Sequence, residues 1–195
     1  TLSSANKTLI PAVNATYVEG PITEDTIWTL VDSPFIVSND VTVCPNVTLT
    51  IEPNVEVRFG GNFSLSVEGR LIAEGTEDKT VRFTSNKDNS SAGDWGTIKF
   101  NVANYDEAWS SSVKYCIIEY GTNGITVENG YLSIQNSSLK LNSWNGLMII
   151  NGDAIIRNSE IVDCTASGIY IAGGNVTVQD LSLIHISEPT RQAEI

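Results

Sequence analysis

Short runs of alternating apolar and polar residues fill the chain from about residue 35 onward. Examples are VTLTI at 47–51, VEVRF at 55–59, FSLSV at 63–67 and TVRFTS at 80–85. A period of two is typical of β-strands with one buried face, and the Gly, Asn, Asp and Pro residues between the runs are typical of tight turns. No stretch combines helical spacing with caps at both ends. The pattern therefore predicts an all-β fold.

A repeat of 22 residues orders these strands, because apolar positions align with apolar ones and turn residues with turn residues. The aligned sets are Gly124, Gly146 and Gly168; Ile134, Ile156 and Val178; and Ile117, Leu139 and Ile161. Earlier in the chain, VRF at 57–59 returns at 81–83 after a slip of two residues. A unit this short cannot bury its own apolar face and must stack on its neighbours.

Twenty-two residues suffice for about three short strands and three turns, at roughly 3.3 Å per strand residue. We therefore predict a single-stranded right-handed parallel β-helix, a β-solenoid with about 22 residues per coil. Inward Val, Ile, Leu and Phe side chains are expected to stack in columns through its core.

Four segments carry a resemblance to a known family. The segments 26–59 and 65–85, with GDWGTIKF at 93–100, resemble the opening coils of extracellular right-handed parallel β-helix proteins. The later segment 124–171, which begins GITVENGYLSIQNSSLKLN, is similar to the pectate-lyase-like β-helix repeat. The resemblance covers roughly residues 20–180 and implies the fold and an extracellular or cell-surface location. It implies no activity, because this fold carries lyases, hydrolases, adhesins and structural modules alike.

The repeat also divides the chain. Residues 1–19 are predicted to be a linker or the approach to an N-terminal cap, and residues 20–180 the β-helix. An N-terminal cap is expected at 20–36, with its apolar side chains Ile27, Trp28, Leu30 and Phe35. The segment 181–195 contains no Asn or Gly, and Leu181–Arg191 corresponds codon for codon to a strand of a transposase-based sequencing adapter. We predict that this tail is non-native, that only 181–184 complete a strand, and that His185 belongs to no site.

Charge and cysteine content narrow the class of partner. The formal net charge is −12 at pH 7, which disfavours nucleic acid and anionic membranes as partners. No apolar run is long enough to span a bilayer. Cys116 and Cys164 are two coils apart, about 9.6 Å, and a disulfide reaches only about 7 Å. We expect buried thiols in place of a disulfide framework.

Candidate chemistry is sparse. With His185 set aside, the chain has no histidine, which excludes histidine triads and histidine zinc sites. Asp88 and Asp94, in NKDNSSAGDWG at 86–96, could hold calcium, and a solvated insertion is the other interpretation. Calcium is the one cofactor considered.

Outward side chains offer two further hypotheses. Arg58 and Arg82, with Glu52 and Glu56 nearby, could bind a uronate-rich polymer, or they could form the ion pairs of a solvated strand face. The aromatic residues could stack on sugar rings if exposed, or could pin the insertions to the core. These aromatic residues are Trp95, Tyr105, Trp109 and Trp144.

Seven N-x-[ST] sequons favour a secreted or surface glycoprotein. One of them, Asn136, shares the 22-residue spacing with Asn158 and Asp180. We expect these three to form an Asn ladder along one turn, which would leave Asn136 unglycosylated. The remaining glycosylation candidates are Asn6, Asn14, Asn46, Asn62, Asn89 and Asn175.

Together these features indicate an extracellular or cell-surface structural or adhesive β-helix module, with polysaccharide or another surface component as its partner. The alternative is a fragment of a carbohydrate-active enzyme, a polysaccharide lyase or hydrolase, whose catalytic coils are missing. No catalytic residue is assigned, and the question of enzymatic activity stays open.

Overall fold

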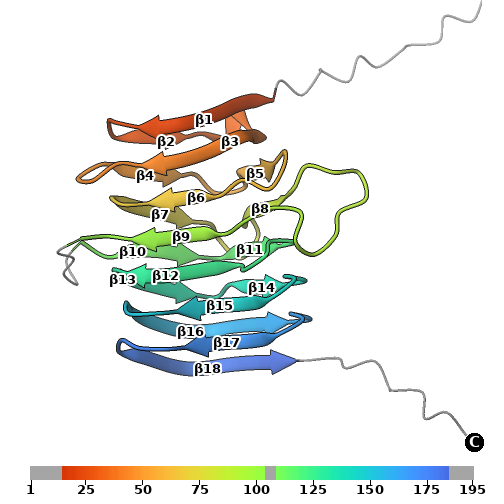
Figure 1. Ribbon diagram of the computed structural model, residues 1–195. Helices are drawn as coiled ribbons and strands as arrows, with labels where there is room; N and C mark the ends of the chain where they lie inside the picture. Colours follow the sequence, from red (N-terminus) through yellow and green to blue (C-terminus); the bar gives the residue numbers. More distant parts are fainter. Residues whose placement is uncertain (1–14, 104–108, 185–195) are drawn as a thin grey trace, which may run out of the picture.

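The computed structural model describes residues 15–103 and 109–184. Its strands pair in parallel and form a β-solenoid of about seven turns, roughly 22 residues apart. Figure 1 shows the turns stacked from β1 at one end to β18 at the other. A 3-10 turn at Leu30–Asp32, called η1, lies between β2 and β3. The predicted all-β solenoid is confirmed.

The pairing resolves into three parallel sheets that run along the solenoid axis. The first sheet contains β6 (Leu65–Val67), β9 (Ile98–Asn101), β12 (Ile125–Asn129), β15 (Asn145–Ile149) and β17 (Ser167–Ile171). The second contains β2 (Thr26–Trp28), β4 (Thr48–Ile51), β7 (Arg70–Glu74), β10 (Ser111–Lys114) and β13 (Tyr131–Gln135). The third contains β5 (Glu56–Phe59), β8 (Val81–Ser85), β11 (Cys116–Glu119) and β14 (Ser138–Lys140).

Four longer strands bend around a corner and so belong to two sheets each. β1 (Thr16–Ile22) and β3 (Phe35–Val43) join the third sheet to the first, and β16 (Asp153–Val162) and β18 (Val176–Ile184) join the second to the third. The first described strand therefore begins at Thr16, inside the segment for which the sequence predicted a linker or the approach to a cap.

Most of the predicted columns are present. Ile134, Ile156 and Val178 pair in register, and a Cβ added to Gly124 would meet the carbonyl oxygen of Gly146 at 2.6 Å. Gly146 meets Gly168 in the same way, at 2.9 Å. The glycines therefore stack because each backbone approaches the next too closely for a side chain.

One predicted column is wrong by a residue. Ile118, and not Ile117, pairs with Leu139, and Ile118 is fully buried while Ile117 is partly exposed. The turn between β11 and β12 is one residue shorter than the equivalent turn between β14 and β15 in the next coil. A one-residue shift exchanges the inward and outward faces of a strand.

The repeated VRF motif is also out of register. Val57 pairs with Phe83, and Glu56 with Arg82, because the turn between β7 and β8 holds extra residues. The same insertion effect occurs between β5 and β6. There Val41 pairs with Leu65 and Phe63 lies in the turn.

The first coil carries only part of the expected cap. Trp28 and Phe35 are buried and stack with ring centroids 4.8 Å apart. Ile27 and Leu30 are exposed, so they contribute no apolar plug at this end. Residues 1–14 are outside the described ranges.

The last strand follows the expectation for the tail. β18 continues through Leu181–Ile184, and Leu183 pairs with Ile161. Residues 181–184 thus lie in a strand, and His185 is beyond the described residues, so the assignment of 181–195 to a non-native tail stays a prediction. Cys44, Cys116 and Cys164 are free thiols, and the last two are buried, as predicted. Burial raises the pKa of both buried thiols.

Polar ladders along the corners replace the predicted one. Asn136, Asn158 and Asp180 do adopt positive φ of 49°, 47° and 52°, but no hydrogen bond joins their side chains. The hydroxyls beside them bond along the axis: Ser137 Oγ accepts from the Cys116 N–H at 3.1 Å and Ser159 Oγ from the Ser137 N–H at 3.2 Å.

Amide ladders occur at the other two corners. Asn129 Nδ2 donates to Asn101 Oδ1 at 2.8 Å and Asn151 Nδ2 to Asn129 Oδ1 at 3.3 Å. Asn145 Nδ2 donates to Asn123 Oδ1 at 3.0 Å. At these corners the sheet hydrogen bonds are interrupted. Each ladder gives hydrogen-bond partners to polar groups there that the backbone of the next coil does not pair.

Candidate functional site

The outer face of the third sheet carries a group of charged side chains joined by ion pairs. Alternation along β5 and β8 directs Val57, Phe59 and Phe83 inward and Arg58 and Arg82 outward. Two clefts of about 480 and 320 Å³ adjoin this face, and both are lined by Glu56, Arg58 and Arg82. We call this surface the sheet-3 trough, defined by Glu56, Arg58, Arg82, Thr84 and Glu119.

Glu119 is the centre of the trough. Its side chain is 1% exposed, yet it is surrounded by donors. Arg82 Nε donates to Glu119 Oε1 at 2.8 Å, with Arg82 Nη2 beside it, and Thr84 Oγ1 donates to the same oxygen at 3.0 Å. Lys140 Nζ lies 3.6 Å from Oε2. A buried carboxylate needs such partners, since an unpaired charge would be strongly destabilising.

Both arginines point outward, as predicted, and both form ion pairs within the chain. Arg58 Nε donates to Glu56 Oε2 at 2.9 Å. The Arg58 and Arg82 side chains nevertheless remain 40% and 45% exposed. Glu52 is not part of the trough, because its Oε2 accepts from the Leu30 N–H at 3.0 Å. Two guanidinium groups are therefore fixed in place and still accessible from solvent.

The loop 86–97 between β8 and β9 borders the trough and projects from the solenoid in Figure 1. Asp94 anchors it: Oδ1 accepts from Lys87 Nζ at 2.7 Å, and Oδ2 from Ser85 Oγ at 2.7 Å and from the Ser91 N–H at 2.9 Å. Burial acts to raise the pKa of Asp94, but these hydrogen bonds outweigh it and hold the pKa below its ordinary value.

The calcium hypothesis gains no support from this geometry. Both carboxylate oxygens of Asp94 are used by donors from the loop itself, and Asp88 is an exposed residue at the rim of the cleft. Within 15–103 and 109–184, no group of three or more His, Cys, Asp or Glu residues is placed to hold a metal ion.

The aromatic candidates differ in how far their side chains are buried. Trp95 is fully buried: it stacks on Phe59 at 4.0 Å and its Nε1 donates to the Glu119 carbonyl at 2.9 Å. It therefore pins the loop to the core and has no face for a sugar. Trp144 is 60% exposed and Trp109 38% exposed, and Tyr105 falls outside the described part of the chain.

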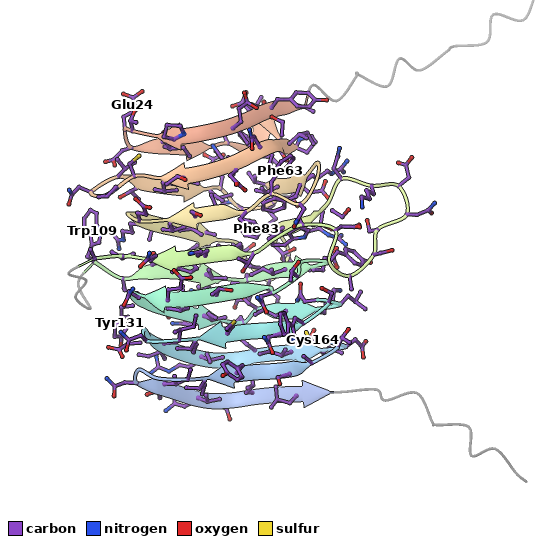
Figure 2. The ribbon with its side chains drawn as sticks, viewed as in Figure 1. Glu24, Phe63, Phe83, Trp109, Tyr131 and Cys164 are labelled. Carbon is purple, nitrogen blue, oxygen red and sulfur yellow. The ribbon has the colours of Figure 1, made fainter. Side chains whose placement is uncertain are left out.

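Trp109 borders a second pocket, of about 370 Å³, which we call the Trp109 pocket. It is lined by Pro45, Asn46, Glu68, Asn101, Val102, Ala103 and Trp109. The Arg70 guanidinium lies 5.4 Å from the Trp109 ring centroid, a cation–π distance. Figure 2 shows Trp109 at the edge of the solenoid opposite the projecting loop, so this pocket and the sheet-3 trough are on different sides.

The sequons that the structure describes are at turns or loops. Asn46, Asn62, Asn89 and Asn175 are exposed, and Asn136 is only partly so. The Asn175 side chain donates to Asp153 Oδ1 at 3.1 Å. Asn6 and Asn14 precede the first described residue.

Sequence reasoning missed Glu119, Thr84 and Lys140. All three follow the outward alternation of the third sheet. The chain between β8 and β11 includes two long connections, 86–97 and 102–110, so no repeat spacing joins Thr84 to Glu119. The sequence could not predict the burial of Glu119 either, because the side chains that cover it come from neighbouring coils.

Comparison with known proteins adds little to this picture. No protein-family profile matches the chain, and no solved structure matches it. A stretch of 65 residues is 34% identical to part of protein bark beetle of Drosophila melanogaster. That stretch is 33% of this chain and 2% of the relative, so the chain spans only a small part of the protein it resembles.

Proposed function

We propose that this chain is a structural or adhesive module of an extracellular or cell-surface protein, and that it contacts acidic glycans through the sheet-3 trough. The observation that carries the proposal is the pair of guanidinium groups on neighbouring strands. Each is held by a carboxylate of this chain and is still 40–45% exposed beside a cleft.

The geometry suits the carboxylates of a uronate polymer. A guanidinium presents five donors in a planar fork, so it can keep one carboxylate partner and still donate to another. The trough runs along the sheet, across coils about 4.8 Å apart, and an extended polymer can follow such a row. The excess negative charge of the rest of the chain limits non-specific binding of polyanions.

The burial and the hydrogen bonds of Glu119 favour a structural role over catalysis. General acid–base work requires a carboxyl group that can exchange a proton with substrate. Both oxygens of Glu119 face Arg82, Thr84 or Lys140, and its side chain is almost completely buried. Its position suits a support for Arg82 and not a group that meets a substrate.

The test is a glycan array probed with the unglycosylated chain, followed by titration with polygalacturonate. We expect binding that weakens with salt, because exposed ion pairs are screened, and no new reducing ends after prolonged incubation. Arg58→Gln should weaken binding about tenfold, the effect of losing one hydrogen bond between charged groups.

Arg157→Gln is the matched control. Arg157 is also an outward arginine of the solenoid, and its Nε donates to Gln179 Oε1 at 2.8 Å, but it lies in the second-sheet part of β16. Equal loss in both variants, or no binding of any acidic glycan, would reject the trough as the contact surface.

A further inference from the structure

The turn between β3 and β4 presents Asn46 to solvent in an unusual conformation. Asn46 has φ of 63°, a left-handed geometry that asparagine tolerates better than most residues. It is exposed and is followed by Val47 and Thr48, which completes the N-x-[ST] sequon. A turn of this kind leaves the side-chain amide accessible to a modifying enzyme.

Asn46 also shares a concave surface with an aromatic ring. It lines the Trp109 pocket together with Glu68 and Asn101. Ser110, next to Trp109, has its carbonyl held by Arg70 Nε at 3.0 Å, and the Arg70 guanidinium covers part of the Trp109 ring. The ring is therefore held in position and remains 38% exposed.

We propose that Asn46 carries an N-linked glycan whose first N-acetylglucosamine packs in the Trp109 pocket. The apolar face of a sugar ring stacks on an aromatic ring, and its hydroxyl groups suit the Glu68 carboxylate and the Asn101 amide at the rim. The pocket volume of about 370 Å³ is in the range of small-ligand sites. The inference rests on the proposed extracellular location, and it is independent of glycan binding at the sheet-3 trough.

Two other sequons serve as a comparison. Asn62 and Asn89 are exposed as well, but neither lines the Trp109 pocket. A glycan there would extend into solvent and leave stability unchanged. The Asn89 sequon depends on Ser91 and the Asn46 sequon on Thr48, so each can be removed without touching the asparagine.

The experiment uses the full chain produced in a secretory eukaryotic host and trimmed to a single N-acetylglucosamine per site. Site occupancy is measured by glycopeptide mass spectrometry and stability by thermal unfolding. Thr48→Ala should lower Tm by about 2 °C, as expected for one aromatic stacking contact in a chain of this size. In the Trp109→Ala background the same substitution should change Tm by less than half as much.

Two controls complete the cycle. Ser91→Ala should leave Tm unchanged in either background, and Thr48→Ala should have no effect on unglycosylated protein from bacteria. Absence of sugar at Asn46, or an equal Tm shift with and without Trp109, would overturn the proposal. Because the polygalacturonate titration uses unglycosylated protein and the opposite side of the solenoid, failure of either proposal leaves the other one testable.

Discussion

The middle coils and the last coil carry equivalent side chains with very different burial. Ile149, Ile156 and Ile161 are 0%, 1% and 2% exposed. Their partners one coil further on, Ile171, Val178 and Leu183, are 50%, 44% and 59% exposed. All six residues are apolar and the registers match, and what differs is the presence of a following coil among the described residues. Burial in this protein is therefore supplied by the neighbouring coil and not by the coil that contains the residue.

The largest expected effect comes from truncating one column at two places. Leu139→Ala should lower the free energy of unfolding by about 2–5 kcal/mol, because it leaves a cavity between two coils. Leu183→Ala should cost less than about 1 kcal/mol, because its side chain already contacts water. Urea titration followed by circular dichroism measures both. Equal losses would break the comparison.

A smaller effect is expected from the stacked glycines. In Gly146→Ala the new Cβ would lie 2.2 Å from Ile161 Cγ2 and 2.9 Å from the Gly168 carbonyl oxygen. The packed core cannot move aside easily, so we expect a loss of about 1–3 kcal/mol. In Gly168→Ala the nearest atom is Leu183 Cδ2 at 2.9 Å, the end of a side chain at the open coil. The free energy of unfolding of that variant should lie within about 0.5 kcal/mol of the wild-type value.

The smallest effect concerns the loop 86–97, which the middle of the solenoid carries and the last coil lacks. The pKa of Asp94 is lower in the folded state, so the ionised carboxylate stabilises the fold above its ordinary pKa of about 3.9 and this contribution is lost as pH falls through the folded value. Asp94→Asn should thus be less stable than wild type at pH 7.

That difference should narrow progressively below about pH 4, where the Asp94 carboxylate is protonated first in the unfolded chain and, at lower pH, in the folded one. Thermal unfolding of both proteins from pH 7 to pH 3 checks it. A gap that stays constant across this range would show that Asp94 acts through packing and not through its charge.

The sequence could predict the solenoid because stacking imposes the period on core positions. Gly124 and Gly146 must be small because the backbone of the next coil approaches each of them closely, and Gly168 continues their spacing, so the period is visible in the sequence. Register was lost where turns change length, as between Val57 and Phe83. Turn insertions face solvent and cost little, so nothing in the strands records them.

The candidate site was only partly predictable for a related reason. Outward positions such as Arg58 follow from alternation alone. The partner of Arg82 does not, because Glu119 is 37 residues away, beyond the long connections 86–97 and 102–110. The amide ladders could not be predicted because asparagine is frequent in this chain. Asn123 and Asn145 keep the 22-residue spacing, but many asparagine pairs match a given spacing by chance.

Hydrogen exchange measured by mass spectrometry tests the central claim most directly. β13 pairs with β10 on one side and β16 on the other, whereas β18 pairs with β16 alone. If neighbouring coils supply the stability, amides of β13 should exchange at least about tenfold more slowly than those of β18. Protection of β18 equal to that of β13 would contradict the account.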